Sequence, residues 1–212
     1  MTPSDHFPDT FPPPLARRPR REELAAYAGA TLESLVFPGA RLLFAGINPS
    51  LWSAAVQAHF ATPGNRFWPA LAKAGITSRV FDWSAGIPGE DAEELRDRGV
   101  GISGFVDRAT ARADELSAAE LRAGGLRLVE RVAEWQPRVV AVLGLTAYRS
   151  AYGVKAKAGP QDPPPGADAG VTEWWVLPNP SGLNAHETLD SLAGAYRRAA
   201  EHAGVSLRDP TS

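Results

Sequence analysis

The stretch Arg41–Ser50, "RLLFAGINPS", decides the fold prediction for this chain. An apolar run ends in Gly46 and is followed at once by Asn48 and Pro49, which favour an abrupt turn. Because the run is apolar throughout rather than alternating, it predicts a strand buried on both faces, as in a parallel sheet. Open parallel sheets bind ligands beyond the carboxyl ends of their strands, which is where Asn48 would stand. Taken alone, Asn-Pro could simply make the turn.

Further runs of the same character predict the other strands of a four- to five-stranded sheet. These runs lie at 101–106, 138–144 and 173–180. Apolar residues at helical spacing predict helices at 21–35, 66–75, 91–97, 117–134 and 186–203. The alternation predicts an α/β fold, a single three-layer domain in which a central, mostly parallel sheet carries helices on both faces. The Pro- and Gly-rich stretch 157–170 is expected to be an exposed loop.

Length and composition predict one domain with short extensions. A chain of 212 residues with 44% hydrophobic content can bury one core, and we expect the domain to span 21–205. The Pro-rich stretch 1–20 is expected to be a disordered or loosely attached extension, and 206–212 a tail. No apolar run approaches the roughly 18 residues that span a bilayer, and there is no signal-peptide core, which favours the cytoplasm and no membrane partner.

Charge and cysteine content restrict the kinds of catalytic and binding site that the chain can form. Because the sequence has no cysteine, it excludes disulfides, thiolate metal sites and cysteine nucleophiles. The histidines have no partners at metal-ligand spacing, so we expect no metal. A formal net charge of −2 gives no overall attraction to nucleic acid, so DNA binding would need a local basic patch. The Arg-rich stretch 17–21 could supply one or be a solvated tail.

Two strand-end motifs share one shape. "GINPS" at 46–50 ends the first strand, and "LPNPSGLN" at 177–184 ends the last. In a parallel sheet both ends face the same way, so Asn48 and the loop after the last strand can meet over one cleft. Between them, "HFATPGNRFW" at 59–68 places Phe60 in a Pro/Gly turn, where an aromatic is commonly core packing. A turn alone does not explain why two such motifs would meet at one edge of the sheet.

The chain carries, in order between residues of about 41 and 200, the stretches "FAGINPS", "FATPGNRFWPALAKAG", "GFVDRATARADELSAAELRAGG", "EWQPRVVAVLG" and "WVLPNPSGLN". In these it resembles the mismatch-specific uracil-DNA glycosylases, the thymine-DNA-glycosylase-like branch of the uracil-DNA glycosylase superfamily. The resemblance implies a DNA repair enzyme that flips uracil out of double-stranded DNA, with G·U mispairs preferred, and hydrolyses the N-glycosidic bond to leave an abasic site. It also implies a monomer without cofactor in the bacterial cytoplasm or nucleoid.

The resemblance implies that Asn48 is catalytic, and the position of Asp107 after an apolar strand makes it a second catalytic candidate. Asn48 would hold the attacking water through its amide oxygen, and because uracil leaves readily as an anion, a neutral amide can suffice. Asp107, in "FVDR", would polarise the water or offset positive charge at C1′. It could instead be a structural carboxylate that pairs with Arg108 or caps the next turn. No lysine stands at the position of Asn48, so Schiff-base chemistry and strand cleavage are not implied.

Other roles implied by the resemblance concern the base and the duplex. Phe60 would stack on the flipped uracil, and Leu183 would fill the gap left in the duplex. The base-binding residues would be Ile47, Ser50, Ser53, Phe60 and Asn179. The DNA wedge and backbone contacts would be Ser181, Gly182, Leu183, Asn184 and Arg108. An aromatic platform and an apolar wedge together offset the roughly few kcal/mol that base flipping costs.

Four positions depart from the family or stay open. Ser50 stands where the family usually has Gly, and its bulk on the C5 side of the base should disfavour thymine. Gly104 stands where a relative can have Lys, which leaves a gap in the pocket wall. Asn65 could read the base edge, but an Asn that opens a helix is commonly an N-cap, so we leave it out of the catalytic set. His59 could contact phosphate or sugar.

Two other classes of function stay open from the sequence. A non-catalytic damage sensor would flip and hold bases without cleaving them, but it would not need a water-holding amide at Asn48. A small-molecule α/β enzyme could use the same cleft without DNA. The wedge-like "PSGLN" loop and the flanking arginines argue against this second alternative, whereas the acidic charge balance favours it.

Overall fold

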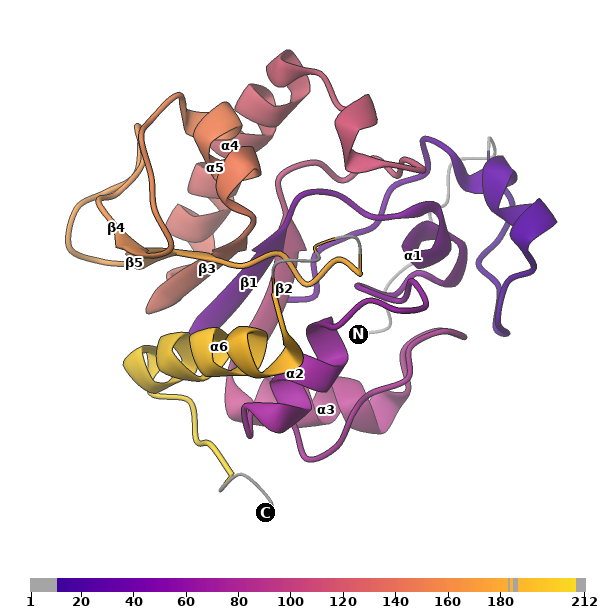
Figure 1. Ribbon diagram of the computed structural model, residues 1–212, viewed down its shortest axis with the longest axis horizontal. Coiled ribbons are helices and arrows are strands. Elements are labelled where there is room, and N and C mark those ends of the chain that lie inside the picture. The colour runs from indigo at the N-terminus through magenta and orange to yellow at the C-terminus, as the bar shows by residue number, and fades with distance from the viewer. Residues whose placement is uncertain (1–10, 183, 185–186, 209–212) are drawn as a thin grey trace.

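A five-stranded sheet forms the centre of the protein (Figure 1). The computed structural model describes residues 11–182, 184 and 187–208. The strands are β1 (Leu42–Gly46), β2 (Val100–Gly104), β3 (Val139–Leu143), β4 (Gly159–Gln161) and β5 (Glu173–Leu177), in the order β2-β1-β3-β5-β4. Because β1, β2, β3 and β5 run parallel and β4 pairs antiparallel at the edge, the predicted mostly parallel α/β fold is confirmed.

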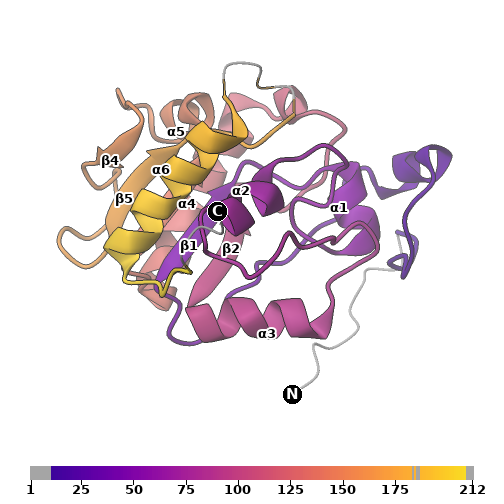
Figure 2. The same ribbon diagram turned by 60° about the horizontal axis from the view of Figure 1, so that its bottom comes forward.

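Helices cover both faces of the sheet (Figure 2). They are α1 (Leu51–Val56), α2 (Phe67–Lys73), α3 (Gly89–Arg98), α4 (Ala118–Trp135), α5 (Leu145–Tyr152) and α6 (Leu189–Ala203), with the 3-10 helices η1 (Arg21–Tyr27) and η2 (Ala113–Glu115). One face packs against α4 and α5 through side chains such as Leu128 and Tyr148. The other packs against α2, α3 and α6 through Phe67, Leu95 and Tyr196. These are the three layers that the sequence predicted.

The strand β1 shows why its sequence is apolar throughout. Successive side chains of a strand point to opposite faces of the sheet. Leu42 and Phe44 are buried against α2, α3 and α6, whereas Leu43 and Ala45 are buried against α4 and α5. Both faces of β1 therefore bury apolar side chains, which is why its sequence does not alternate between apolar and polar residues.

The parallel pairing continues beyond the ends of β1 and β2 and places two loops side by side. Within the strands, Gly46 lies opposite Gly104. Past them, the Val106 N–H donates to the Ile47 carbonyl at 3.0 Å, and the Thr110 N–H donates to the Pro49 carbonyl at 3.2 Å. The loop after β2 thus runs along the Asn-Pro motif at the carboxyl edge of the sheet.

Several predicted elements differ from the structure. The predicted helix 21–35 is wrong beyond Tyr27, because the chain then turns to form β-bridges from Thr31 to Arg108 and from Leu35 to Ile102. The stretch 157–170 is not all loop, since it contains β4. The helices α1 and α5 were not predicted.

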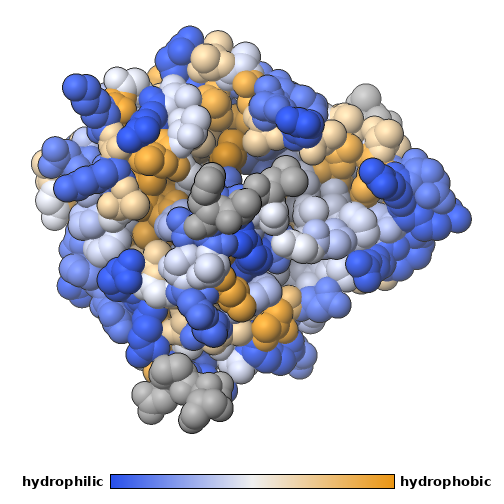
Figure 3. Space-filling view, in the orientation of Figure 1, coloured by the Kyte–Doolittle hydropathy of each residue, from blue (hydrophilic) through white to orange (hydrophobic). Residues whose placement is uncertain are grey.

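The N-terminal stretch lies against the domain over residues 11–20. The Leu15 N–H donates to the Ala55 carbonyl at 2.7 Å, and the Tyr27 hydroxyl donates to the Pro13 carbonyl at 2.8 Å. Phe11 packs in the same small apolar cluster beside α1. Figure 3 shows hydrophilic side chains gathered over this N-terminal region at the right of the molecule. Within the described part of the chain, no helix is both long and apolar enough to cross a membrane.

Candidate active site

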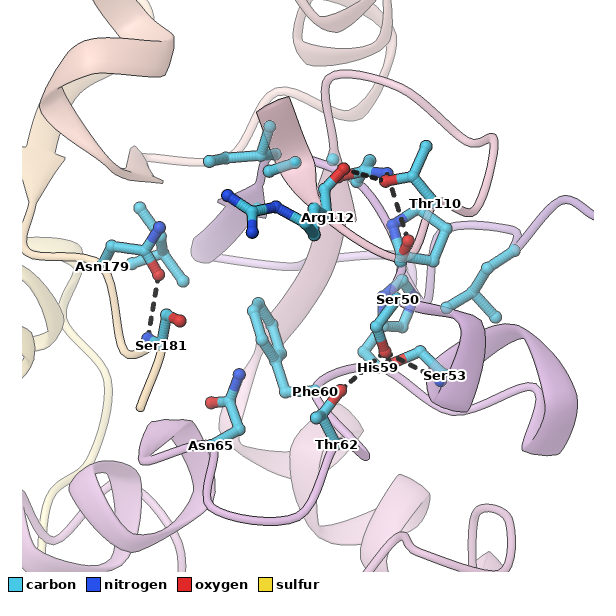
Figure 4. Close-up of a pocket in the computed structure, with 18 of the residues that line it drawn as sticks. Ser50, Ser53, His59, Phe60, Thr62, Asn65, Thr110, Arg112, Asn179 and Ser181 are labelled. Carbon is cyan, nitrogen blue, oxygen red and sulfur yellow. Dashed lines mark hydrogen bonds between the residues drawn. The ribbon is translucent and has the colours of Figure 1, made fainter. Parts of the chain in front are cut away.

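A pocket of about 720 Å³ opens at the carboxyl edge of the sheet (Figure 4). Of the residues predicted for the site, the pocket is lined by Ile47, Asn48, Ser50, Ser53, Phe60, Asp107, Asn179, Ser181 and Gly182. Arg108 and Asn184 do not line it, and Leu183 lies outside the described residues. The structure therefore brings most of the predicted site residues together around one cavity, although they come from distant parts of the chain.

The amide of Asn48 is held in one orientation. Its Nδ2 donates to the Pro49 carbonyl at 3.1 Å, the Arg108 carbonyl at 3.0 Å and the Thr110 Oγ1 at 2.8 Å. Carbonyl oxygens only accept, so it must be the nitrogen that faces these partners. Among the described residues none donates a hydrogen bond to Asn48 Oδ1. The amide oxygen is therefore left as a free acceptor in a residue that lines the pocket.

Thr110 is a site residue that sequence reasoning missed. It is 2% exposed, accepts from Asn48 and donates through Oγ1 to the Arg112 carbonyl at 2.7 Å. A threonine three residues after Asp107, in a loop that follows a strand end, was the available signal. That signal alone does not reveal the contact, because Thr110 meets Asn48 through pairing between two distant loops.

Ser50 both lines the pocket and begins α1. Its Oγ accepts from the Ser53 N–H at 3.1 Å, which satisfies one of the free N–H groups at the start of the helix. The same hydroxyl lies 2.6 Å from the Thr62 Oγ1 and 3.1 Å from the Ser53 Oγ. Ser50 therefore joins α1 to the loop that carries Phe60, and its hydroxyl is fixed rather than free to rotate.

The ring of Phe60 is fixed within the pocket wall. It stacks on Phe67, with centroids 3.9 Å apart and planes at 25°. Its backbone has φ of 55°, in the left-handed region that non-glycine residues seldom adopt. A Cβ on Gly46 would lie 3.3 Å from the Phe60 ring, so the glycine of the first motif makes room for this aromatic. A ring buttressed by Phe67 is a rigid platform for stacking.

The carboxylate of Asp107 is paired with Arg131 of α4. Arg131 Nη1 donates to Oδ1 at 3.0 Å and Nη2 donates to Oδ2 at 2.5 Å, in a bidentate arrangement. The alternative that pairs Asp107 with Arg108 is therefore wrong. Arg108 instead binds Glu120 through Nε at 3.0 Å and Nη2 at 2.7 Å. Asp107 stays on the pocket wall with 31% of its side chain exposed.

His59 is a neutral member of the pocket wall. Burial lowers the pKa of its imidazole to about 4, against smaller opposing effects from its hydrogen bond to the Glu33 carbonyl and from the charge of Asp107. Its Nε2 lies 2.9 Å from that carbonyl, which only accepts, so Nε2 carries the proton. A neutral ring supplies no positive charge to attract a phosphate.

Arg66 secures the loop that follows β5. Its Nη2 donates to the carbonyls of Ser181 and Asn184, each at 2.8 Å, and its Nη1 donates to the Glu187 carbonyl. Asn179 adds an internal bond, since its Oδ1 accepts from the Ser181 N–H at 2.9 Å. The predicted wedge loop is thereby tied to the start of α2, a connection that the sequence did not predict.

Asn65 stands just before α2. Its Oδ1 accepts from the Phe67 N–H at 2.9 Å, but the N-cap of α2 is Arg66, so the prediction of an N-cap at Asn65 is wrong by one residue. The residue also lines the pocket, and Figure 4 shows its side chain directed to the cavity beside Phe60. The described residues contain no group of three or more His, Asp or Glu side chains placed to hold a metal ion.

The sequence of the chain matches the family described as the uracil DNA glycosylase superfamily over residues 33–200. The chain belongs to this superfamily. The matched segment contains every predicted site residue, from Ile47 to Asn184. Membership makes uracil-DNA glycosylase activity in DNA repair, hydrolysis of an N-glycosidic bond, the expectation for this protein.

A solved structure shares the fold of this superfamily member. It is the solution NMR structure of a candidate uracil DNA glycosylase from Methanosarcina acetivorans, with a TM-score of 0.53 and 15% sequence identity. The similarity covers 83% of this chain and 98% of the other. At this identity the likeness concerns the fold, a mostly parallel sheet between layers of helices.

Proposed function

We propose that this protein is a monofunctional, mismatch-specific uracil-DNA glycosylase of the thymine-DNA-glycosylase-like branch. It flips uracil out of double-stranded DNA, prefers G·U mispairs, and acts as a monomer without cofactor. The observation that carries the proposal is the orientation of Asn48. Three acceptors hold its nitrogen, so that its oxygen is the free acceptor. A water placed by that oxygen is what hydrolysis of a glycosidic bond requires.

In the proposed reaction the C1′–N1 bond of the nucleotide breaks and its electron pair leaves with the base. The sugar becomes oxocarbenium-like, and the oxygen of the water held by Asn48 adds to C1′ while its proton passes to solvent. Asp107 supplies a negative charge on the same wall, which offsets the positive charge developing at C1′. Because Arg131 binds both of its oxygens, Asp107 acts in this proposal as a fixed charge rather than as a base.

The base would lie against Phe60, with Ile47, Ser53 and Asn179 around its edges. All four residues line the pocket. Ser50 would face C5 of the pyrimidine, where uracil has hydrogen and thymine has a methyl group. Since the Ser50 hydroxyl is held by Ser53 and Thr62, it cannot swing aside easily, which supports discrimination against thymine.

The loop after β5 would enter the duplex. Ser181, Gly182, Leu183 and Asn184 form the proposed wedge, of which Leu183 lies outside the described residues. The hydrogen bonds from Arg66 to the carbonyls of Ser181 and Asn184 support this role, because a loop held in place before binding loses less entropy when it is inserted. Arg108 would contact the DNA backbone after exchanging Glu120 for a phosphate.

The proposal is tested by incubating the protein with duplexes that carry one G·U, A·U or G·T pair. The duplexes are then treated with alkali, which cleaves abasic sites. We expect cleavage at uracil, fastest for G·U, and no cleavage before alkali. A damage sensor would bind the uracil duplex and leave it intact. A small-molecule enzyme would neither bind nor cleave it.

A further inference from the structure

Arg112 lies at the open end of the pocket. It lines the cavity, yet 73% of its side chain is exposed, and its Nη2 binds Asp114 Oδ2 at 2.6 Å. Its Nε donates to Asp114 Oδ1 at 3.0 Å. In the view of Figure 4 the Phe60 ring lies between Arg112 and Asn65. An ion pair this exposed holds its partners weakly, so the guanidinium can change partner.

The backbone of Arg112 is fixed even though its side chain is exposed. Its N–H donates to Glu115 Oε1 at 2.8 Å, and its carbonyl accepts from the Thr110 hydroxyl at 2.7 Å. Thr110 in turn accepts from Asn48 at 2.8 Å. The base of the Arg112 side chain is therefore anchored close to the proposed catalytic amide.

The pocket can hold more than a base. Its 720 Å³ lies in the range of about 300–1,000 Å³ that encloses whole drug-sized ligands, and a pyrimidine ring is much smaller. With the base against Phe60, the sugar and a phosphate would occupy the rest. Asp107 and Asp114 would repel a phosphate there. Among the described residues that line the pocket, Arg112 is the one cation, since His59 is neutral.

We propose that Arg112 releases Asp114 and binds a phosphate that flanks the extruded nucleotide. This inference rests on the proposed function, because it starts from an extruded nucleotide in the pocket. The paired N–H donors of a guanidinium match the geometry of phosphate oxygens. Asp114 then acts as a competitor that occupies Arg112 when DNA is absent, which sets how tightly the target strand is held.

The inference is tested by measuring binding to a duplex at a series of salt concentrations. The duplex carries one 2′-fluoro-deoxyuridine opposite G, and this nucleotide resists cleavage. Arg112→Gln should weaken binding about tenfold and reduce the slope of log K against log salt by about 0.9. Asp114→Asn should tighten binding about threefold, because the competitor is lost. Arg198→Gln removes the same charge from an exposed position on α6 and is the matched control; it should change binding by less than about twofold.

Neutral methylphosphonate groups, placed at one phosphate at a time, then locate the contact. At the contacted phosphate the substitution should weaken binding of the wild-type protein about tenfold and that of Arg112→Gln hardly at all. At other phosphates both proteins should lose equally. Equal losses at every position overturn the inference, even where Arg112→Gln binds weakly, and so does a salt slope that Arg112→Gln leaves unchanged.

Excision from an ordinary G·U duplex keeps the two proposals apart. If wild-type protein releases uracil and Arg112→Gln binds the duplex as tightly as wild type does, the role of Arg112 is overturned and the proposed function still holds. Wild-type protein that releases no uracil from any duplex overturns the proposed function, and this inference with it.

Discussion

The hydroxyl of Thr110 accepts a hydrogen bond of 2.8 Å from the side-chain amide of Asn48, which lies 62 positions away in the sequence. Thr110 donates its own proton to a backbone carbonyl, so its oxygen must accept. The amide nitrogen is thereby fixed and the amide oxygen is left free. This relationship defines where a water could be held.

Asn48→Ala should lose most excision activity and still bind uracil-containing duplex. The side chain is proposed to place water rather than DNA, and loss of a positioned catalytic group costs on the order of tenfold or more. Single-turnover excision and equilibrium binding, measured on the same preparation, check this. An unchanged single-turnover rate would remove Asn48 from the catalytic role.

Thr110→Val should slow single-turnover excision about tenfold, equivalent to about 1.4 kcal/mol in the barrier, because the Asn48 amide then loses one of its three acceptors and is held less firmly. Thr110→Ser keeps the hydroxyl and is the matched control, which should stay within about threefold of wild type. Thermal unfolding of both variants separates positioning from stability. If valine and serine slow excision equally, the hydroxyl does not orient the amide.

Ser50→Gly should raise the rate on G·T relative to G·U. A methyl group in a pocket accounts for only about 1–3 kcal/mol of discrimination, so removing the opposing side chain can recover part of it. Loss of the helix cap should cost only a few tenths of a kcal/mol, since Gly is tolerated at this position. Thr62→Val breaks the bond to the Ser50 hydroxyl without emptying the space and serves as the control. A constant ratio in Ser50→Gly would show that thymine is excluded elsewhere.

Asp107→Asn should slow base release at least about tenfold if its charge acts on the sugar. Arg131→Gln removes the partner and leaves the carboxylate, so it should slow release far less while lowering the melting temperature by a similar amount. The two variants thus share the broken ion pair and differ in the charge on the pocket wall. Equal excision rates, with equal losses of stability, would make Asp107 a structural residue.

His59 should make the folded protein less stable in mild acid. Its folded pKa of about 4 lies below the unfolded value of about 6.5, so between these values the unfolded chain binds the additional proton. Stability is therefore lost as pH falls from 6.5 to 4, by up to about 3 kcal/mol from this group. Denaturant unfolding at pH 7 and pH 4.5 checks this. His59→Gln should lose less stability between the two pH values than wild type.

The strands could be predicted because their signal is local. The predicted run 101–106 overlaps β2 except for Val100, 138–144 contains β3, and 173–180 begins with β5. A strand buried on both faces must be apolar at each consecutive position, so a few residues suffice to reveal it. The motifs that place Asn48 and Phe60 beside the pocket are equally local.

The short helices depended on the rest of the molecule. α1 has 6 residues and α5 has 8, and each begins directly after the turn that follows a strand, so neither stands apart from the strand signal before it; α2 has only 7 residues but follows a separate Pro/Gly loop. Conversely, the apolar spacing that predicted a helix to residue 35 yielded to β-bridges made by Thr31 and Leu35. Local propensity is weak enough that tertiary pairing overrides it.

The sequence by itself determined the α/β sheet, the edge at which the pocket lies and the motif residues that line it, because apolar runs and turn motifs act over a few neighbouring positions. Tertiary structure alone decided which side chains meet. Asp107 pairs with Arg131, 24 positions away, and Arg66 reaches Ser181, 115 positions away. Several arginines were available to Asp107, and the docking of α4 on the sheet brought one within reach, a choice made by packing rather than by any pattern along the chain.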